Sequence, residues 1–277
     1  MDNRDIQRLF AAAKYYNGDI DGDLGPKSMA AADALFANRY DELQAGHTSW
    51  EPRRRAVAAA QLILKHAGHP VGVIDGLSGP DTEFALTQWI YVQAHGTLPE
   101  AWRDGEEDDE DDEDELPLNG WPRQTQSELV RFYGRAGGPQ CTAGKVNLPF
   151  TMKIAWDLGQ KINRFSCHEK VADSAERAYR KIASSYSAQD ISRLGFDLFG
   201  GCYNYRVKRG GSTLSTHAFG IAIDTDPIRN QLKWGSDRAM LATPECKEYW
   251  RIWESEGWIS LGRNRNYDWM HVQAARL

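Results

Sequence analysis

The sequence is poor in cysteine, and its four cysteines form no C-x-x-C pair. This absence excludes a disulfide-rich scaffold and a cysteine-based zinc cluster. We therefore expect reduced thiols that pack as small apolar side chains, with a single disulfide as the alternative. The four positions are Cys141, Cys167, Cys202 and Cys246.

Long apolar runs are also absent. No stretch of eighteen apolar residues occurs, which excludes a membrane-spanning helix. Residues 1–5 are polar and charged, and the apolar stretch after them is short and interrupted. Because this start lacks the pattern of a secretory signal, we expect synthesis in a cytoplasm. Coiled-coil heptads are missing as well, and we expect a monomer.

Basic residues are missing from one segment. Residues 104–115 contain eleven acidic residues and no basic one, within a chain of net charge −6. Like charges at this density can be neither buried nor paired, so we predict a disordered spacer over residues 103–118. Residues 116–277 are basic, with 23 Lys and Arg against 15 Asp and Glu. This excess suits an anionic polymer, although no motif predicts a nucleic-acid partner.

An internal repeat lies in the first hundred residues. Residues 17–30 read NGDIDGDLGPKSMA and residues 71–84 read VGVIDGLSGPDTEF, so that Asp21 aligns with Asp75, 54 positions later. Asp-Gly favours a turn, and a proline after glycine favours the first position of a helix. Apolar residues at helical spacing flank each copy, at 6–13 and 30–36 and again at 57–63 and 84–91. Each copy therefore predicts a helix, a glycine-rich loop and a second helix.

This pattern resembles the peptidoglycan-binding repeat of cell-wall hydrolases, whose loop reads D-G-x-x-G-P-x-T. The resemblance implies two all-α repeats, over residues 1–46 and 50–98, with bacterial peptidoglycan as partner. Two linked weak sites gain effective concentration, which favours a binding array over a helical bundle without a ligand. The loop residues expected to serve the wall are Asp21, Gly22, Gly25, Asp75, Gly76 and Gly79.

The second half of the chain, residues 119–277, has a mixed pattern. Helical periodicity appears at 151–164, 169–185 and 187–194, and again around Tyr249, Ile252 and Trp253. Short strand-like runs lie at 199–206, 219–225 and 269–274. Helices first and strands later predict an α+β domain with a small antiparallel sheet.

Two short motifs in this half carry the chemistry. The first reads STHAFGIAID and places an aspartate, Asp224, at the end of a strand that is too apolar to be exposed. A buried carboxylate is nearly always paired, capped or bound to metal. The second motif reads YDWMHV, where Asp268 precedes His271 by three residues. Two imidazoles and one carboxylate, His217, Asp224 and His271, suit one catalytic zinc ion with a fourth position left for water. Hydrolysis also needs a base, and Asp268 is the candidate.

Together the two motifs, S-x-H-x-x-G-x-A-x-D and a late D-x-x-H, resemble the zinc D-alanyl-D-alanine carboxypeptidase family (VanY-like). That family includes L-alanyl-D-glutamate endopeptidases of phage endolysins. The resemblance implies a compact α+β fold with zinc on His217, Asp224 and His271 and with Asp268 as the catalytic base. Many carboxypeptidases of the family have glutamate at the Asp268 position, so the aspartate here favours an endopeptidase.

The resemblance also implies an arginine shortly before the first motif that steadies the carbonyl oxygen. Arg206 fits this role and Arg209 is the second choice, with a surface arginine as the alternative for either. Ser215 is expected to support the zinc site by hydrogen bonding, because no G-x-S-x-G elbow surrounds it. His168 and most of the ten tryptophans are interpreted as structural.

These patterns lead to one preferred hypothesis and two alternatives. The preferred one is a modular phage endolysin that cuts the L-Ala–D-Glu bond of the stem peptide, made in the host cytoplasm and acting on the cell wall after release. The first alternative is a D-Ala-D-Ala carboxypeptidase. The second is a non-catalytic wall-binding protein with structural zinc, and Asp268 is the feature against it.

Overall fold

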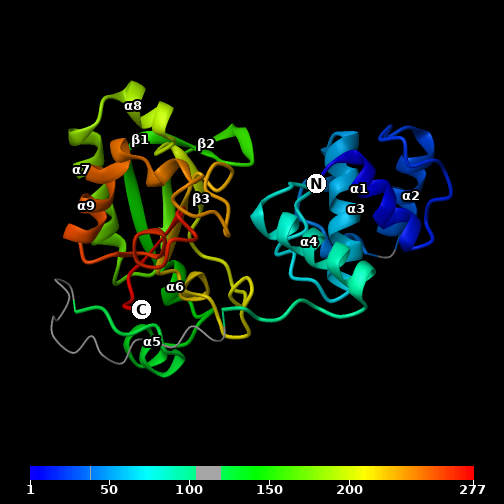
Figure 1. The fold of residues 1–277 in the computed structure, drawn as a ribbon. Helices are drawn as coiled ribbons and strands as arrows, with labels where there is room; N and C mark the ends of the chain where they lie inside the picture. The colour runs from blue at the N-terminus through cyan, green and yellow to red at the C-terminus, as the bar shows by residue number, and fades with distance from the viewer. Residues whose placement is uncertain (38, 104–119) are drawn as a thin grey trace. The chain divides into compact units, whose positions relative to one another are not determined.

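The computed structural model describes residues 1–37, 39–103 and 120–277, and the chain forms two compact units, Met1–Glu100 and Ala101–Leu277 (Figure 1). Almost all of the predicted spacer therefore lies outside the described residues. No helix among the described residues is long and apolar enough to cross a membrane.

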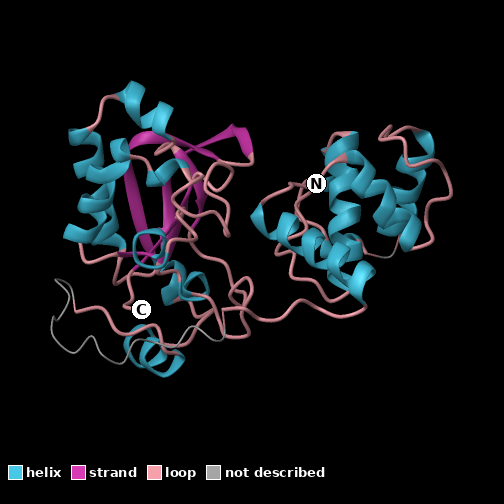
Figure 2. Ribbon diagram, in the orientation of Figure 1, coloured by secondary structure: helices cyan, strands magenta, loops and turns pink. Residues whose placement is uncertain are grey.

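The first unit contains four α-helices, in agreement with the helices predicted from the repeats (Figure 2). Pro26 and Pro80 begin the second and fourth helices, as the Gly-Pro pairs predict. Apolar side chains from all four helices share one buried core. The helices are α1 (Asn3–Ala12), α2 (Pro26–Phe36), α3 (Pro52–His66) and α4 (Pro80–His95), with short 3-10 turns at Tyr40–Glu42 and His47–Ser49.

A buried glutamine organises the loop of each repeat. Gln7 donates to the Asp21 carboxylate at 2.8 Å and accepts from the Gly22 backbone N–H at 2.8 Å. Gln61 makes the same pair of bonds to Asp75 and Gly76, at 3.1 and 2.8 Å. The repeat thus extends to these glutamines, again 54 positions apart, and the Asp-Gly residues of the motif build the loops themselves.

The second unit contains a six-stranded sheet in the order β2-β1-β3-β4-β6-β5. All neighbours are antiparallel except β1 and β3, which run parallel. The mixed α+β class is confirmed, but the sheet is neither small nor purely antiparallel. The strands are β1 (Gly144–Ile154), β2 (Asp157–Cys167), β3 (Leu198–Gly201), β4 (Ala222–Thr225), β5 (Ile259–Ser260) and β6 (His271–Gln273).

The predicted helix over 151–164 is wrong, because this segment belongs to the hairpin of β1 and β2. The residues Val146, Leu148, Phe150, Met152 and Ile154 alternate with polar or exposed positions, and alternation with period two is typical of a strand. Pairing between the two strands is interrupted after Asn147, next to a proline that has no N–H to donate. Pairing with β2 and with the distant strand β3 therefore determines that residues 144–154 form a strand and not a helix.

The helices at 172–185, 188–194 and 247–255 lie where the periodicity predicts them, whereas the sequence did not predict those at 126–133, 140–143 and 261–265. Ser187 caps the helix that follows it by accepting from the backbone N–H of Asp190. The helices are α5 (Gln126–Tyr133), α6 (Gln140–Ala143), α7 (Ala172–Ser185), α8 (Ala188–Leu194), α9 (Lys247–Ser255) and α10 (Leu261–Arg265), with 3-10 turns at Thr216–Phe219, Met240–Ala242 and Pro244–Cys246.

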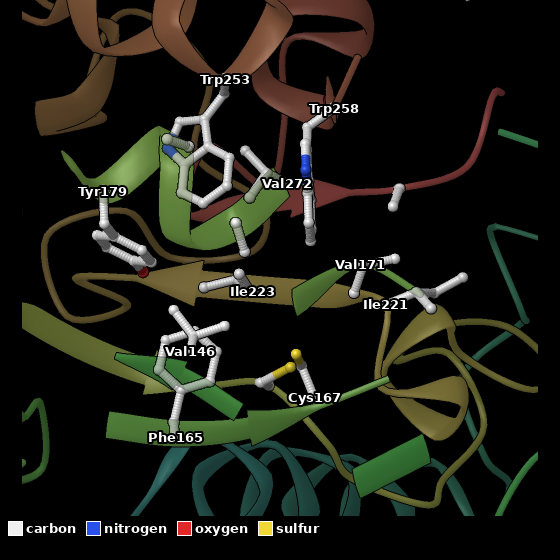
Figure 3. Packing of buried hydrophobic residues seen from close by; sticks show 14 of the residues in the cluster. Val146, Phe165, Cys167, Val171, Tyr179, Ile221, Ile223, Trp253, Trp258 and Val272 are labelled. Atoms are coloured by element: carbon white, nitrogen blue, oxygen red, sulfur yellow. The ribbon is translucent and has the colours of Figure 1, made fainter. Parts of the chain in front are cut away.

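The core of the second unit lies between the sheet and helices α7 and α9 (Figures 1 and 3). Tyr179 and Trp253 meet edge to face at 5.4 Å, and Ile223 and Val272 lie in the same cluster (Figure 3). All four cysteines are buried and free, as predicted. Burial raises the pKa of Cys167 to about 12, so this thiol stays protonated and inert.

Candidate metal centre

The site is built on two neighbouring strands, β4 and β6. Asp224 lies directly opposite His271 in the antiparallel register, and Ile223 lies opposite Val272. Because side chains alternate across a strand, each of these pairs shares one face of the sheet. Ile223 and Val272 are fully buried in the core, which holds Asp224 and His271 on the other face. Packing of the apolar pair therefore positions the polar pair.

His217 reaches the same place from the 3-10 turn Thr216–Phe219. Ser215 caps this turn, and its hydroxyl accepts from the His217 backbone N–H at 3.3 Å. The turn ends at Gly220, whose φ of 68° favours glycine. A Cβ at this position would also collide with the carbonyl oxygen of Cys141. Ser215 therefore caps the turn, and glycine is required at position 220 both by the backbone conformation and by the close approach of Cys141.

The three predicted ligands come together. His217 Nε2 lies 3.2 Å from Asp224 Oδ1, and His271 Nδ1 lies 3.1 Å from the same oxygen. His217, Asp224 and His271 are all buried, and their ligand atoms all lie within 4.8 Å of one another. Four-coordinate zinc with bonds of about 2.0–2.1 Å separates its ligand atoms by roughly 3.3 Å. The observed spacing is close to that value.

Hydrogen bonds on the far side of each ring leave the inner nitrogens available. His217 Nδ1 lies 2.6 Å from the carbonyl oxygen of Cys202, which assigns the ring proton to Nδ1. His271 Nε2 lies 3.1 Å from Gln273 Oε1, which assigns the proton of that ring to Nε2. The lone pairs of His217 Nε2 and His271 Nδ1 then face Asp224. Outer partners of this kind orient metal-binding histidines.

Two further observations fit a cation at this point. Among the described residues, His217 Nε2 is buried and has no hydrogen-bond partner. Burial alone would raise the pKa of Asp224, but the imidazoles of His217 and His271 hold that pKa well below its usual range. That lowering requires positive charge between the imidazoles and the carboxylate, which a metal ion supplies when the inner nitrogens carry lone pairs. An anionic carboxylate and two imidazole nitrogens form the ligand set that zinc prefers.

A narrow cavity opens in front of the three residues. Asp268, Arg206, Arg209 and Ser215, all singled out from the sequence, line it together with the proposed ligands. The cavity has about 20 Å³ of free space, enough for little more than one water molecule. The structure thus gathers every predicted site residue of the second half around one point. The six loop residues of the repeats belong to the other unit.

Asp268 has a constrained backbone. Its φ is 55°, which is uncommon for a residue other than glycine. Its N–H donates to Leu232 O at 2.9 Å, and its own carbonyl accepts from the His271 N–H at 3.0 Å. This tight turn, which the D-x-x-H spacing alone does not reveal, brings the Asp268 side chain to the cavity.

Two arginines of the cavity, Arg206 and Arg209, come from the segment 206–214. Arg206 donates from Nη1 to Val207 O at 3.0 Å, and its own carbonyl accepts from the Ser215 N–H at 3.0 Å. Arg209 is buried and lines the cavity from the 207–214 loop, which directly follows Arg206.

The sequence interpretation missed several residues of the site. Gln273 lies two positions after His271 on the same strand, so its side chain lies on the same face, and the H-x-Q spacing could have indicated it. Arg103, Lys208 and Gln124 also line the cavity, and no local pattern marks them. His168 is structural as predicted, because Nε2 contacts Tyr133 O at 2.8 Å and Nδ1 accepts from the Lys170 N–H.

Comparison with known proteins gives one family match. Residues 209–274 match the model of the D-alanyl-D-alanine carboxypeptidase family, and the matched range contains His217, Asp224, Asp268 and His271. The match supports a metallopeptidase that acts on peptides of peptidoglycan, and peptidases of this family are zinc-dependent. It does not cover the repeats or Arg206. No curated protein and no solved structure matches the chain.

Proposed function

We propose that this chain is an endolysin-like peptidoglycan hydrolase, a zinc-dependent endopeptidase that cleaves the L-Ala–D-Glu bond of the stem peptide in the cell wall. The observation that carries the proposal is the buried His217, Asp224 and His271 group with Asp268 lining the same cavity. An aspartate at position 268, where many carboxypeptidases of the family have glutamate, favours the endopeptidase.

In this proposal each residue has a defined chemical role. Zinc held by His217, Asp224 and His271 would polarise the scissile carbonyl and lower the pKa of the attacking water towards ~7. The Asp268 carboxylate accepts the proton from that water and then passes it to the leaving amine. A guanidinium from Arg206, or else from Arg209, donates to the carbonyl oxygen as it gains negative charge.

A D-Ala-D-Ala carboxypeptidase is the second candidate, because the matching family model carries that description. Product analysis separates the two. We expect purified muropeptides incubated with the zinc-loaded protein to gain a new amino terminus at D-Glu, measured by mass spectrometry, with the terminal D-Ala intact. Release of free D-alanine while the L-Ala–D-Glu bond survives would overturn the proposed bond.

The first unit is proposed to bind the wall. Its helices enclose a hollow of about 330 Å³ whose lining includes Tyr15, Arg39, His66 and Trp89. Aromatic faces beside cationic groups suit the apolar and anionic parts of peptidoglycan. The Asp-Gly loops then serve the wall indirectly, by holding the helices that form this hollow.

We expect the fragment 1–98 to sediment with purified sacculi without cutting them. Tyr15→Ala removes an exposed wall of the hollow, and we expect it to weaken sedimentation about 5–10-fold, since one aromatic contact is worth roughly 1 kcal/mol. Tyr40→Ala is the matched control, because Tyr40 is also exposed and does not line the hollow. If the unaltered fragment stays in the supernatant, the binding assignment is wrong.

A further inference from the structure

Two residues at the start of the second unit, Trp102 and Arg103, pack against residues of the candidate active site. The Arg103 side chain is only 10 % exposed, and its Nη1 lies 3.6 Å from Asp268 Oδ2. Arg103 lines the same cavity as the three proposed metal ligands. It precedes them by more than a hundred residues and lies outside the range that matches the family model.

Several contacts hold this segment in place. The Arg103 backbone N–H donates to Gly210 O at 2.8 Å. The guanidinium of Arg103 lies 5.2 Å from the ring centre of Tyr267, and the Trp102 ring meets Tyr267 edge to face at 5.3 Å. The ammonium of Lys233 lies 5.4 Å from the ring centre of Trp102. Cation–π and aromatic contacts of this kind are individually weak, so the segment is held by their sum.

Gly210 makes room for the tryptophan. Its φ is 78°, and a Cβ at this position would collide with the Trp102 indole. The Trp102 ring therefore packs directly against the backbone of Gly210, in space that any other side chain would fill. Gly210 lies in the 207–214 loop, whose ends pair as an antiparallel bridge between Val207 and Leu214. The same loop supplies Lys208 and Arg209 to the cavity.

The segment conflicts with substrate binding in two ways. With Arg103 in place the cavity has about 20 Å³ of free space, room for about one water molecule and not for a peptide. In addition, the Asp268 carboxylate faces the guanidinium of Arg103 instead of a reacting proton.

We propose that Trp102 and Arg103 form an autoinhibitory latch, in which Arg103 occupies the place of the substrate beside Asp268 and Trp102 anchors it on Gly210 and Tyr267. This inference rests on the proposed function of Asp268. Opening requires Arg103 to leave the cavity. The cavity is otherwise rich in cations, from Arg206, Lys208 and Arg209, so an anionic peptide is attracted to it, and the peptide carboxylate competes with Asp268 for Arg103.

Activity on a soluble stem peptide tests the latch. A closed fraction reduces apparent activity by that fraction, so a latch that holds about nine in ten molecules closed predicts a roughly 10-fold rise in kcat/KM for Arg103→Ala. Arg251→Ala is the matched control, because Arg251 is an exposed arginine whose ion pair with Glu248 lies on α9, and we expect no change. A fall in kcat/KM for Arg103→Ala would make Arg103 a substrate-binding residue and overturn the latch, as would an unchanged value.

Trypsin provides a readout that needs neither metal nor activity. Trypsin must bind an extended arginine side chain, so the buried Arg103 of the latched chain resists cleavage at the following bond. We expect Trp102→Ala to speed this cleavage at least 5-fold, measured by mass spectrometry of short digests, and Tyr40→Ala to leave it unchanged. Equal cleavage rates in the unaltered chain and in Trp102→Ala would overturn the latch. Slow cleavage that Trp102→Ala relieves supports it even in a preparation without peptidase activity, and the proposed function alone would then fail.

Discussion

Asp268→Asn is expected to lower peptidoglycan hydrolysis by about 10²–10⁴-fold while zinc stays bound, because this change removes the proton acceptor and leaves the proposed ligands in place. The amide has nearly the same shape as the carboxylate, and the backbone bonds of Asp268 to Leu232 and His271 do not involve its side chain. The measurements are the release of muropeptides from purified sacculi and the zinc content per chain.

Asp237→Asn is the control for this change, because Asp237 is exposed and does not line the cavity. We expect it to retain full activity. Unchanged hydrolysis in Asp268→Asn would remove Asp268 from the mechanism. A loss of zinc in Asp268→Asn would instead show that Asp268 helps to hold the metal.

His271→Ala is expected to abolish both stable zinc binding and activity, because two remaining protein ligands cannot form the three-ligand site of a catalytic zinc. Zinc that binds only the folded chain stabilises it, by about 2.7 kcal/mol at a concentration 100 times Kd. We therefore expect added zinc to raise the Tm of the unaltered protein and not that of His271→Ala. Chelation should reverse the effect in the unaltered protein.

Two further variants serve as an intermediate case and as a control for the loss of zinc binding in His271→Ala. Gln273→Leu removes the outer hydrogen-bond partner of His271, and loss of such a partner typically costs 10–100-fold in metal affinity. His95→Ala removes a histidine of the other unit that stacks on Tyr91, and zinc should still raise its Tm. A zinc-dependent rise in Tm that survives in His271→Ala would mean that the metal binds elsewhere.

The hairpin of β1 and β2 depends on strand pairing more than on its local sequence pattern. The period-two pattern from Val146 to Ile154 was present, but the polar residues after it also fit a helix. Only the pairing of β1 with β2 and with β3 decides between the two, since strand pairing brings together segments that are distant in the sequence. The helices α1 to α4 carry their own start signals in Pro26, Pro80 and the flanking apolar periodicity, and they were predictable for that reason.

The sequence by itself determined the local parts of this protein. These parts are the S-x-H-x-x-G turn, the Asp-Gly loops with a proline that starts the next helix, and a ligand set whose chemistry suits zinc. The turn and the loops depend on residues a few positions apart, and the ligand set is indicated by two short motifs, so that backbone preferences and donor atoms can be recognised without the fold.

The tertiary structure alone decided which of these parts meet. The antiparallel register places Asp224 opposite His271, and a shift of one residue would have turned Asp224 into the core. The buried glutamines Gln7 and Gln61 and the outer partner Gln273 have meaning only through contacts that the fold creates. Arg103 reaches Asp268 across 165 positions of chain. Long-range packing sets such contacts, and for this reason the spacing of residues predicted a metal site but not the arginine that covers it.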